Sequence, residues 1–441
     1  MRLAFVNHSY IELPRQGGGL NSNSIGLWNY QIATRLAEDH DVTVYHQRRG
    51  RAADELVEHG GVHWQSYSVR QDERAHKMVA RWDGLRRRMG LRGNPRRPRF
   101  ATPGHYRRYI DAVAADIARR ECEAVHISNY PQFASAVRRH NPRAKINLHM
   151  QCDWLVQLDA DVLAPHLERC DLISGCSDYV VDGIRRRFPA LADRCYTLYN
   201  GVDPTEFVPG DEAHDGSHVL FVGRLSPEKG LHTLLDALAR IAPQHPRLRV
   251  TIVGGRVQVP YEFVVALSDD PKVRALAQFY AGDDPFAYER ALHRMVESRG
   301  DGVLRGRVEF IDHIPQPELR QLYRGADVFV FPSDWDEPFG MPVIEAMASG
   351  VPVVTTQSGG IPEFVTDGVT GLVVPRADAA ALAGALDRLL GDAGLRRAMG
   401  ARGRQAVADG FTWDHATAAL LRALLPAGTR AGRHDLDPSP T

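Results

Sequence analysis

The chain has 441 residues, of which 44% are hydrophobic and 24% are charged, and its 54 lysines and arginines balance its 54 acidic residues. This length and composition are typical of a globular protein with two domains of roughly 200 residues each. The zero net charge argues against whole-molecule attraction to nucleic acid, and no window holds the ~18–20 consecutive apolar residues of a membrane span.

The amino-terminal stretch and the cysteines set further expectations. The first ten residues contain only a short apolar run, so they do not resemble a secretory signal, and we expect a cytoplasmic protein. The five cysteines, at positions 122, 152, 170, 176 and 195, show no C-x-x-C spacing. We expect buried reduced thiols rather than disulfides or a zinc site.

The first half of the chain alternates short apolar, β-branched runs with helical patterns. Such runs are typical of strands that are buried on both faces of a parallel sheet covered by helices. The predicted strands are 2–8, 41–46, 123–128, 145–150 and 172–177.

A basic stretch lies between the second and third of these strands. Met78, Trp82, Leu85 and Met89 recur at helical spacing, which predicts an amphipathic helix over 77–90. Eight arginines accompany it: Arg81, Arg86, Arg87, Arg88, Arg92, Arg96, Arg97 and Arg99. Residues 77–99 could therefore make a peripheral membrane contact at the inner membrane face, or simply form a solvated face.

A second series of strands follows a linker, predicted at 203–217 from its Pro, Asp and Gly content. Its members are 218–224, 249–255, 308–313, 328–333, 351–356 and 371–375, and residues 412–425 are predicted to form a last helix. An apparent insertion at about 256–284 could shape a nucleotide pocket, contact a protein or be a surface excursion.

The pattern predicts an α/β fold with two doubly wound, Rossmann-like domains and a cleft between them. We place the first domain at 1–204 and the second at 205–410. A carboxy-terminal helix at 411–425 could pack back on the first domain, and a tail at 426–441 is expected to be disordered.

The segment EPFGMPVIEAMASGVPVV, residues 337–354, carries the strongest chemical signal. Pro342 suits the first turn of a helix, and a helix that begins near Gly340 directs its free N–H groups at a ligand in the cleft. Glu337 and Glu345, eight residues apart, could bracket a bound group.

The motif EPFGMPVIE (337–345) is accompanied, in order along the chain, by FVGRLSPEKG (221–230), ADVFVFPS (326–333), ASGVPVV (348–354) and GGIPEFV (359–365). Together they resemble the retaining glycosyltransferases of family 4. The resemblance implies the GT-B architecture. It also implies transfer of a hexose from a nucleotide-diphospho-sugar, of the UDP-glucose or UDP-N-acetylglucosamine type, to an acceptor hydroxyl.

The resemblance also implies roles for individual residues. Arg224 and Lys229 would hold the donor diphosphate, Glu345 the ribose and Glu337 the transferred sugar. The N–H groups of Phe339, Gly340 and Met341 would support the sugar and phosphates. In the first half, Gly18 and Gly19 of the GGGLN loop would approach the diphosphate, and His149 would lie near the anomeric carbon. Asn21 and Asp153 are candidates on the acceptor side, although Asp153 could instead cap a helix.

Asp334 and Asp336 form a D-x-D pattern like the metal motif of a different glycosyltransferase architecture. The resemblance to GT-B enzymes implies no metal and no cofactor, so we do not interpret these residues as a metal site. No residue is an obvious covalent nucleophile, and the resemblance implies front-face substitution.

Other interpretations remain open. The chain could be another GT-B enzyme, such as a phosphorylase or a sugar-nucleotide epimerase, or a non-catalytic nucleotide-sugar-binding protein. The acceptor could be a small molecule, a saccharide or a lipid.

Overall fold

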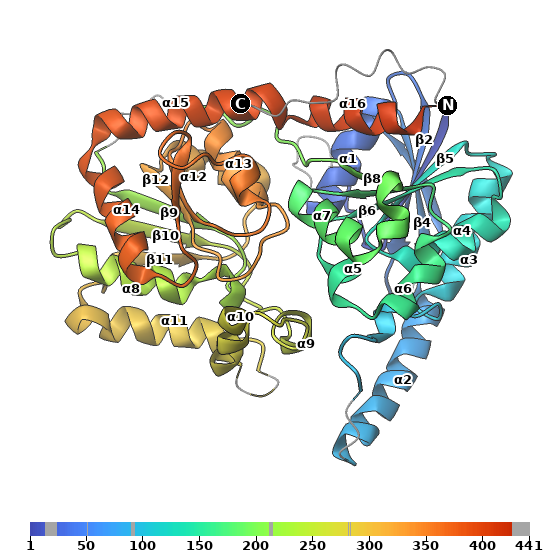
Figure 1. Ribbon diagram of the computed structural model, residues 1–441, viewed down its shortest axis with the longest axis horizontal. Coiled ribbons are helices and arrows are strands. Elements are labelled where there is room, and N and C mark those ends of the chain that lie inside the picture. Colours follow the sequence, from blue (N-terminus) through green and yellow to red (C-terminus); the bar gives the residue numbers. More distant parts are fainter. Residues whose placement is uncertain are drawn as a thin grey trace.

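A computed structural model describes residues 1–13, 24–50, 52–89, 93–210, 215–280, 282 and 284–425. The described chain forms two α/β halves, each built around one sheet (Figure 1). The predicted architecture of two Rossmann-like domains is confirmed. The predicted tail at 426–441 lies outside the described residues.

The amino-terminal sheet has eight strands in the order β3-β4-β2-β1-β5-β6-β7-β8. Every neighbouring pair is parallel except β3 with β4. The strands are β1 (Arg2–Val6), β2 (Asp41–Arg48), β3 (Glu55–His59), β4 (Val62–Ser68), β5 (Ala124–Ser128), β6 (Lys145–Met150), β7 (Leu172–Gly175) and β8 (Cys195–Thr197).

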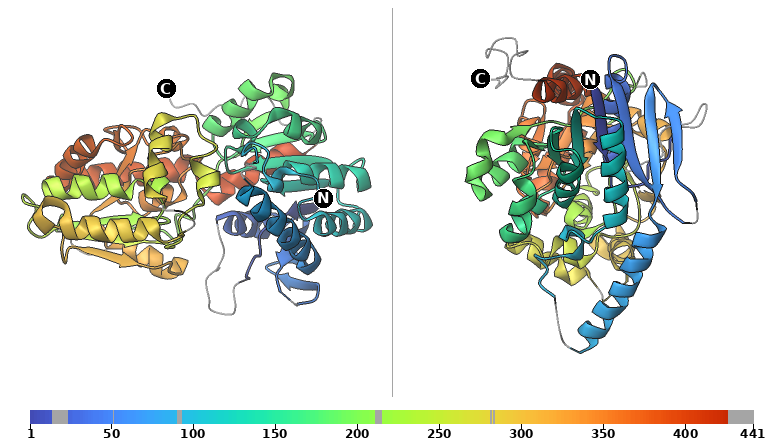
Figure 2. Two further views of the ribbon diagram at one scale, coloured as in Figure 1. Left: turned by 90° about the horizontal axis from the view of Figure 1, so that it is seen from below. Right: turned by 90° about the vertical axis from the view of Figure 1, so that its right-hand side faces the viewer.

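Helices cover both faces of this sheet. They are α1 (Ser24–Leu36), α2 (Arg70–Arg88), α3 (Arg107–Arg119), α4 (Pro131–His140), α5 (Trp154–Gln157), α6 (Ala160–Leu167) and α7 (Asp178–Arg187). Helix α2, which extends the helix expected at 77–90, projects away from the body of this half (Figures 1 and 2). No described helix is both long and apolar enough to cross a bilayer.

The carboxy-terminal sheet has six parallel strands in the order β11-β10-β9-β12-β13-β14. The strands are β9 (His218–Val222), β10 (Arg249–Val253), β11 (Val308–Ile311), β12 (Val328–Phe331), β13 (Val353–Thr356) and β14 (Gly371–Val374). Its helices are α8 (Leu231–Ile241), α9 (Tyr261–Val264), α10 (Pro271–Ala275), α11 (Ala287–Ser298), α12 (Gln316–Arg324), α13 (Met341–Ala348), α14 (Ala379–Gly391) and α15 (Ala393–Gly410).

The central strands of both sheets are buried along most of their length, and most of their side chains are apolar on both faces. In β12 all four residues are buried, and in β9 the last four are. Each large apolar side chain that is fully removed from water contributes roughly 1.5–3 kcal/mol. Polar residues follow where these strands end, so the chemistry collects at the carboxyl edges of the sheets.

The last described helix, α16 (Trp413–Leu424), returns to the amino-terminal half. Trp413, Leu420 and Leu424 join Phe5 and Trp28 in one apolar cluster. The ammonium of Lys145 donates to the carbonyl of Ala423 at 2.7 Å and so satisfies a carbonyl at the end of the helix. The chain therefore crosses between the halves twice.

Three strands were not predicted: β3, β4 and β8. The first two form a hairpin whose turn, Gly60–Gly61, has positive φ at both residues. The side chains of β4 alternate between buried and half-buried, and those of β3 are mostly exposed. Their pattern therefore differs from the continuous apolar runs on which the other strands were predicted.

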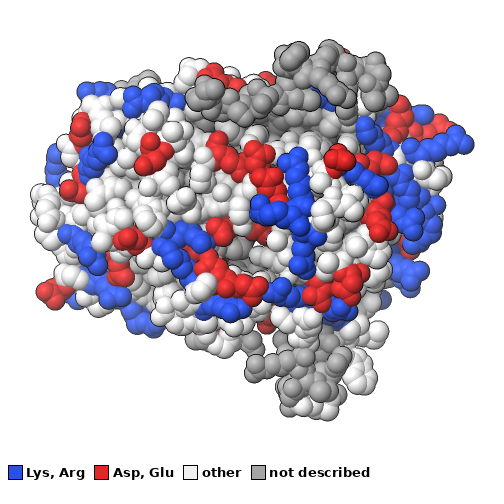
Figure 3. All heavy atoms as spheres, in the orientation of Figure 1, with Lys and Arg blue, Asp and Glu red and all other residues white. Residues whose placement is uncertain are grey.

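The two halves touch directly across the cleft. The hydroxyl of Ser177 donates to the carbonyl of Pro338 at 2.6 Å. The Glu363 carboxylate accepts the N–H groups of Asp178 and Tyr179 at 2.8 and 2.7 Å, at the positive amino-terminal end of α7. Charged side chains of both signs mix where the halves meet in Figure 3. The two halves are therefore in direct contact at these residues.

Candidate active site

Lys229 and Glu337 form an ion pair at the carboxyl edge of the second sheet. Lys229 ends a short turn after β9, and Glu337 lies in the loop after β12. The Nζ–Oε2 distance is 2.5 Å, and the side chains are only 15% and 13% exposed. Gly230, at φ +69°, permits this approach, because a Cβ there would lie 1.9 Å from the carbonyl oxygen of Pro332.

Aromatic rings surround this pair. The indole N–H of Trp335 donates to the same Glu337 oxygen at 3.0 Å. The ammonium of Lys229 lies 5.4 Å from the ring centre of Phe331 and 5.6 Å from that of Trp335. Such surroundings exclude water and strengthen charge-assisted contacts to a ligand.

Glu345 lies one turn into α13 and is buried. Its carboxylate accepts a hydrogen bond from the hydroxyl of Tyr323 at 2.8 Å. Burial raises the pKa of Glu345 to about 7, while the Tyr323 hydrogen bond and the charge of Arg320 act in the opposite direction. A buried carboxylate with one hydroxyl partner can still accept hydrogen bonds from ligand hydroxyls.

Helix α13 begins directly after Gly340, whose φ is +100°. A Cβ at this position would lie 3.2 Å from the side chain of Ile361. Phe339 is buried against the core, and Met341 is half-buried. The amide groups of the first helical turn form the positive end of a helix dipole, which suits a phosphate or a polarised sugar oxygen.

Arg224 lies in the turn that follows β9 and is exposed. Together with Lys229 it lowers the pKa of the buried Glu228, although burial is the larger effect and raises that pKa overall. Two cations therefore act at the end of β9, one buried with Glu337 and one exposed.

His149 lies at the carboxyl end of β6 and is fully buried. Its Nδ1 is hydrogen-bonded to the Ser174 hydroxyl at 3.0 Å, and its ring stacks on Trp28 at 4.9 Å between centroids. Burial lowers its pKa to about 3. The imidazole is therefore neutral, and its Nε2 has no hydrogen-bond partner among the described residues.

Asp153 precedes α5, but its side chain makes no capping hydrogen bond to that helix. It accepts instead from the hydroxyl of Tyr179 at 3.5 Å, and its Oδ1 has no partner among the described residues. Burial first, then the charges of Asp336 and Glu337, raise its pKa to about 7. Asp153 therefore faces the carboxy-terminal half across the cleft.

The aspartates of the D-x-D pattern are both engaged by protein groups. Asp334 is buried and accepts from the Thr233 hydroxyl at 3.0 Å and from the N–H of Ala377 at 2.8 Å. Asp336 forms an ion pair with Arg376 at 3.2 Å. No cluster of three potential metal ligands occurs within the described ranges.

The structure thus joins Lys229 directly to Glu337 and brings Asp153 within electrostatic reach of that pair. The described contacts of Glu345 and His149 lie elsewhere, with Tyr323 and with Ser174 and Trp28. Gly18, Gly19 and Asn21 lie outside the described residues. The sequence analysis did not assign a role to Trp335 or Tyr323. Both are aromatic residues close to the segment 326–333, and this was the signal that could have identified them.

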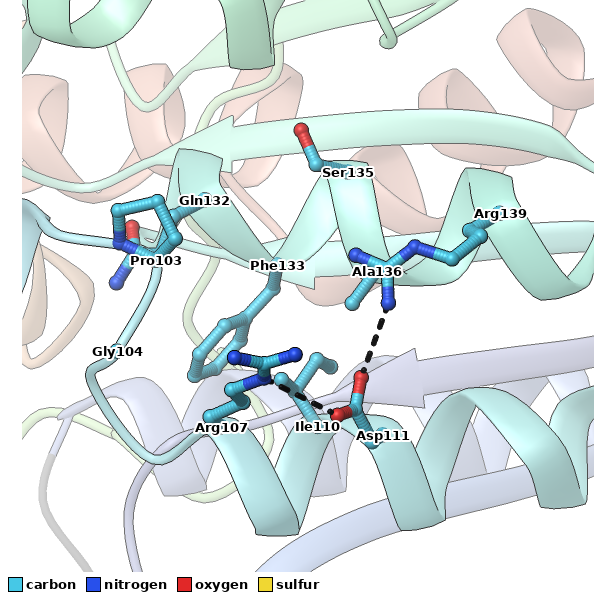
Figure 4. A pocket seen from close by; sticks show the side chains of 10 residues that line it. All are labelled: Pro103, Gly104, Arg107, Ile110, Asp111, Gln132, Phe133, Ser135, Ala136 and Arg139. Atoms are coloured by element: carbon cyan, nitrogen blue, oxygen red, sulfur yellow. Dashed lines mark ion pairs between the residues drawn. The ribbon is translucent and has the colours of Figure 1, made fainter.

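Two cavities accompany these residues. One of about 260 Å³ lies between the halves and is lined by Asp153, Tyr179, Trp335 and Asp336 among others. The other, of about 240 Å³, is lined by residues of the amino-terminal half alone (Figure 4). There Arg107 and Arg139 both point at Asp111, at 3.7 and 3.5 Å, and none of the predicted site residues takes part.

Comparisons with known proteins indicate the class of enzyme. The family model described as glycosyl transferases group 1 matches residues 203–406. A putative glycosyltransferase of Bacillus subtilis is 28% identical over 334 residues, which are 72% of this chain and 75% of that protein. A D-inositol 3-phosphate glycosyltransferase of Nocardia farcinica is 35% identical over 261 residues, 56% of this chain and 51% of that protein.

Among solved structures, an Anabaena protein in complex with UDP and glucose superimposes with a TM-score of 0.64 and 17% identity, over 96% of this chain and 98% of that one. This likeness concerns the fold. The family match covers the half that carries Arg224, Lys229, Glu337 and Glu345. Residues 203–406 therefore form a domain of the glycosyl transferases group 1 type, and the chain as a whole has the GT-B fold.

Proposed function

We propose that the chain transfers a hexose from a UDP-sugar to an acceptor hydroxyl with retention of the anomeric configuration. The observation that carries this proposal is the Lys229–Glu337 pair, held beside Trp335 at the edge of the second sheet. The Anabaena protein of the same fold, solved with UDP and glucose, supports the choice of donor.

Donor binding would rearrange the Lys229–Glu337 pair. The diphosphate takes the ammonium of Lys229 and the guanidinium of Arg224, and the freed Glu337 carboxylate accepts hydrogen bonds from sugar hydroxyls. Negative charge grows on the departing diphosphate, and one preorganised donor at such a position stabilises the transition state by roughly 3–4 kcal/mol. The amino-terminal end of α13 adds its dipole, and the reaction on this proposal uses no metal or cofactor.

Glu345 would bind the ribose. Its carboxylate is oriented by the Tyr323 hydroxyl at 2.8 Å and can accept from two ribose hydroxyls. Because burial favours the protonated acid, ribose hydroxyls that donate to the ionised carboxylate would stabilise the charged form on binding.

His149 would contact the sugar as a neutral hydrogen-bonding group, because its pKa of about 3 excludes an acid role near neutral pH. In the retaining step the acceptor oxygen approaches the anomeric carbon from the face that the diphosphate leaves. The acceptor proton passes to the leaving phosphate oxygen, so no protein nucleophile is required. Closure of the halves excludes water that would hydrolyse the donor.

A donor screen tests this proposal. Calorimetry with UDP-, GDP-, ADP- and TDP-glucose and with UDP-N-acetylglucosamine should show the tightest binding for a UDP-sugar. NMR of the product should show the anomeric configuration of the donor. Formation of a sugar phosphate or an epimer in the presence of phosphate would instead support a phosphorylase or an epimerase, and no nucleotide binding would support a non-catalytic protein.

We also propose that α2 contacts an anionic membrane. Its exposed Met78, Trp82 and the adjacent Met89 are 63%, 66% and 59% accessible, and Lys77 and Arg81 are exposed beside them. Apolar side chains can enter the interface of a bilayer while cations meet its headgroups. The projection of α2 leaves this surface accessible (Figure 1).

Vesicle sedimentation tests the membrane contact. The protein should bind vesicles that contain phosphatidylglycerol but not pure phosphatidylcholine, and Trp82→Ser should weaken binding about tenfold. Val369→Ser removes an exposed apolar side chain of the other half and serves as the control. Equal binding by Trp82→Ser and the parent would exclude α2 as the docking element.

A further inference from the structure

The loop that follows β12 carries Glu337, and the rest of the second half holds this loop from Ser333 onward. Ser333 is buried, and its hydroxyl donates to the carbonyl of Glu228 at 3.1 Å. The N–H of Asp334 donates to the same carbonyl at 2.9 Å. The start of the loop is therefore fixed to the turn that also contains Lys229.

The two aspartates of the D-x-D pattern hold the next part of the loop to its surroundings. The buried carboxylate of Asp334 lies 3.2 Å from the Nε2 of His232. Asp336 pairs with Arg376, whose guanidinium also pairs with Asp270 of the insertion at 2.6 Å. The residue between the two aspartates is thereby held from both sides.

That residue is Trp335, and the insertion at 256–284 holds its ring. Four buried apolar side chains form a small core of their own within the insertion: Val264, Val265, Val273 and Leu276. Trp335 packs against this core, and its indole N–H donates to Glu337. The orientation of the Glu337 carboxylate therefore depends on where the backbone places Trp335.

One hydroxyl bridges the backbone on either side of Asp336. It belongs to Ser358, which follows β13 (Val353–Thr356) and is fully buried. The hydroxyl donates to the carbonyl of Trp335 at 2.6 Å and accepts the N–H of Glu337 at 2.9 Å. A hydroxyl has one donor and two acceptor positions, so both bonds form at the same time.

The two residues after Ser358 contact the same backbone. The N–H of Gly360 donates to the carbonyl of Glu337 at 2.9 Å. Gly359 has φ +48°, and a Cβ there would lie 2.1 Å from that carbonyl oxygen. The main chain of Glu337 is therefore held at both its N–H and its carbonyl, so a rearrangement on donor binding falls to its side chain.

We infer that Ser358 is a positioning residue for recognition of the donor sugar, because its hydroxyl fixes the backbone that carries Glu337 and Trp335. The inference rests on the proposed function, in which Glu337 leaves Lys229 and accepts hydrogen bonds from sugar hydroxyls. A binding carboxylate has to be held within about 0.5 Å of its productive position by the groups behind it. Ser358 supplies this support and acts through Glu337.

Loss of the hydroxyl would affect the sugar more than the nucleotide. Without it, the Trp335 carbonyl and the Glu337 N–H lose a shared partner. Buried backbone groups without partners are costly, so the loop would shift to find new ones. Such a shift moves the Glu337 carboxylate relative to the sugar, whereas Arg224 and Lys229 remain in the turn after β9.

Calorimetry on the full chain with UDP and UDP-glucose tests the inference. Ser358→Ala should weaken UDP-glucose binding about tenfold, as expected for loss of one hydrogen bond to a charged group. The UDP dissociation constant should stay within about twofold. Ser358→Thr keeps a hydroxyl and should retain UDP-glucose affinity within about threefold. Ser358→Cys, with its weakly bonding sulfur, should show the same selectivity as Ser358→Ala and replaces that variant if it does not fold.

Ser217→Ala is the matched control. Ser217 is also buried in the second half, and its hydroxyl donates to Asp215. It precedes β9 and so lies at the opposite edge of the sheet. Loss of this hydroxyl should leave the affinity for UDP and for UDP-glucose unchanged within about twofold.

A double-mutant cycle tests whether Ser358 acts through Glu337. Once Glu337→Ala has removed the carboxylate, adding Ser358→Ala should change the UDP-glucose dissociation constant by less than about twofold. A general effect on structure would instead weaken binding by the same factor in both backgrounds and would contradict the inference. Equal weakening of UDP and UDP-glucose by Ser358→Ala would contradict it as well.

The outcomes separate this inference from the proposed function. If the parent chain binds neither UDP nor UDP-glucose, or if Glu337→Ala binds UDP-glucose like the parent, the proposed function fails and the role of Ser358 fails with it. If Glu337→Ala weakens UDP-glucose binding but Ser358→Ala keeps the parental constants, only the role of Ser358 is wrong.

Discussion

The two edges of the cleft differ in their chemistry. On the amino-terminal edge, His149 and His126 stack with Trp28, and burial lowers the pKa of both histidines, so this edge is neutral and dry. On the carboxy-terminal edge, Lys229 and Glu337 form a charged pair. The difference indicates that the carboxy-terminal edge holds the charged part of the donor, whereas the wall around His149 and Trp28 carries no charge; Asp153 adds a carboxyl from the same half.

We expect the largest effect on turnover from removing the cation of the Lys229–Glu337 pair. Lys229→Ala removes a cation beside the donor phosphates, and among the described residues it leaves the Glu337 carboxylate with the Trp335 N–H alone, so kcat should fall by roughly 10²–10³-fold. The Tm should also fall, because Glu337 is left as a nearly buried carboxylate without its cation, so turnover is compared below the Tm of the variant. Lys77→Ala, on α2, is the matched lysine control for turnover with a soluble acceptor. A parental kcat for Lys229→Ala would refute the predicted diphosphate site.

Glu345→Gln tests the second acidic group of the carboxy-terminal edge, because it replaces a buried carboxylate by a neutral amide of similar size. Nucleotide affinity should fall about 10–100-fold, since a neutral amide accepts ribose hydrogen bonds less strongly than a carboxylate. Calorimetric titration with UDP measures this loss. An unchanged UDP dissociation constant would show that the ribose binds elsewhere.

The same substitution has a pH signature in stability. The pKa of Glu345 is raised to about 7 from its usual value, so ionising this group costs stability as pH rises from about 4.5 through 7. Glu345→Gln removes that cost, which is about 3 kcal/mol above pH 7. The Tm of the variant minus the Tm of the parent should therefore be larger at pH 8 than at pH 5. A larger difference at pH 5 would contradict the assignment of Glu345 as a buried acid.

The neutral edge should show a smaller effect. His149→Ala should lower kcat about tenfold, because it removes hydrogen bonds to the sugar but no charge. In the parent, the His149 ring signals should not titrate between pH 5 and 8, since its pKa lies near 3. A midpoint near pH 6.5 in NMR would show that the imidazole is solvated instead.

The smallest effect concerns a contact between the halves. Arg96→Ala removes the exposed ion pair with Asp269, and exposed pairs contribute little to stability. We expect a Tm shift below about 2 °C. A large loss of stability would show that this pair holds the two halves together by itself.

The sequence predicted the parts of the fold that depend on continuous apolar strands. Eleven strands were expected, and each overlaps an observed one, from β1 to β14. The β3–β4 hairpin was missed because β4 alternates and β3 is exposed, although Gly60–Gly61 is a hairpin signal that could have been used. The insertion's inner core was missed because its apolar residues follow no regular period.

The candidate site was predictable where the chain itself brings residues together. Glu337, Gly340 and Glu345 are close in sequence and bracket the start of α13. The partners that tune them are not: Tyr323 lies 22 residues before Glu345 in the chain, and Asp153 reaches the cleft from the other half. Such pairings depend on tertiary packing and cannot be predicted from the spacing of residues along the chain.

The return of α16 constrains how the molecule can open. The outgoing and returning segments run side by side, with Val202 bridged to Thr412, and a Cβ on Gly201 would lie 2.3 Å from the backbone nitrogen of Trp413. Two adjacent connections form a hinge. They favour rotation of one half relative to the other about the line that joins them and restrict rotation about other axes. Removal of the chain from Trp413 onward would uncover the apolar face of α1 and remove that restriction at the same time.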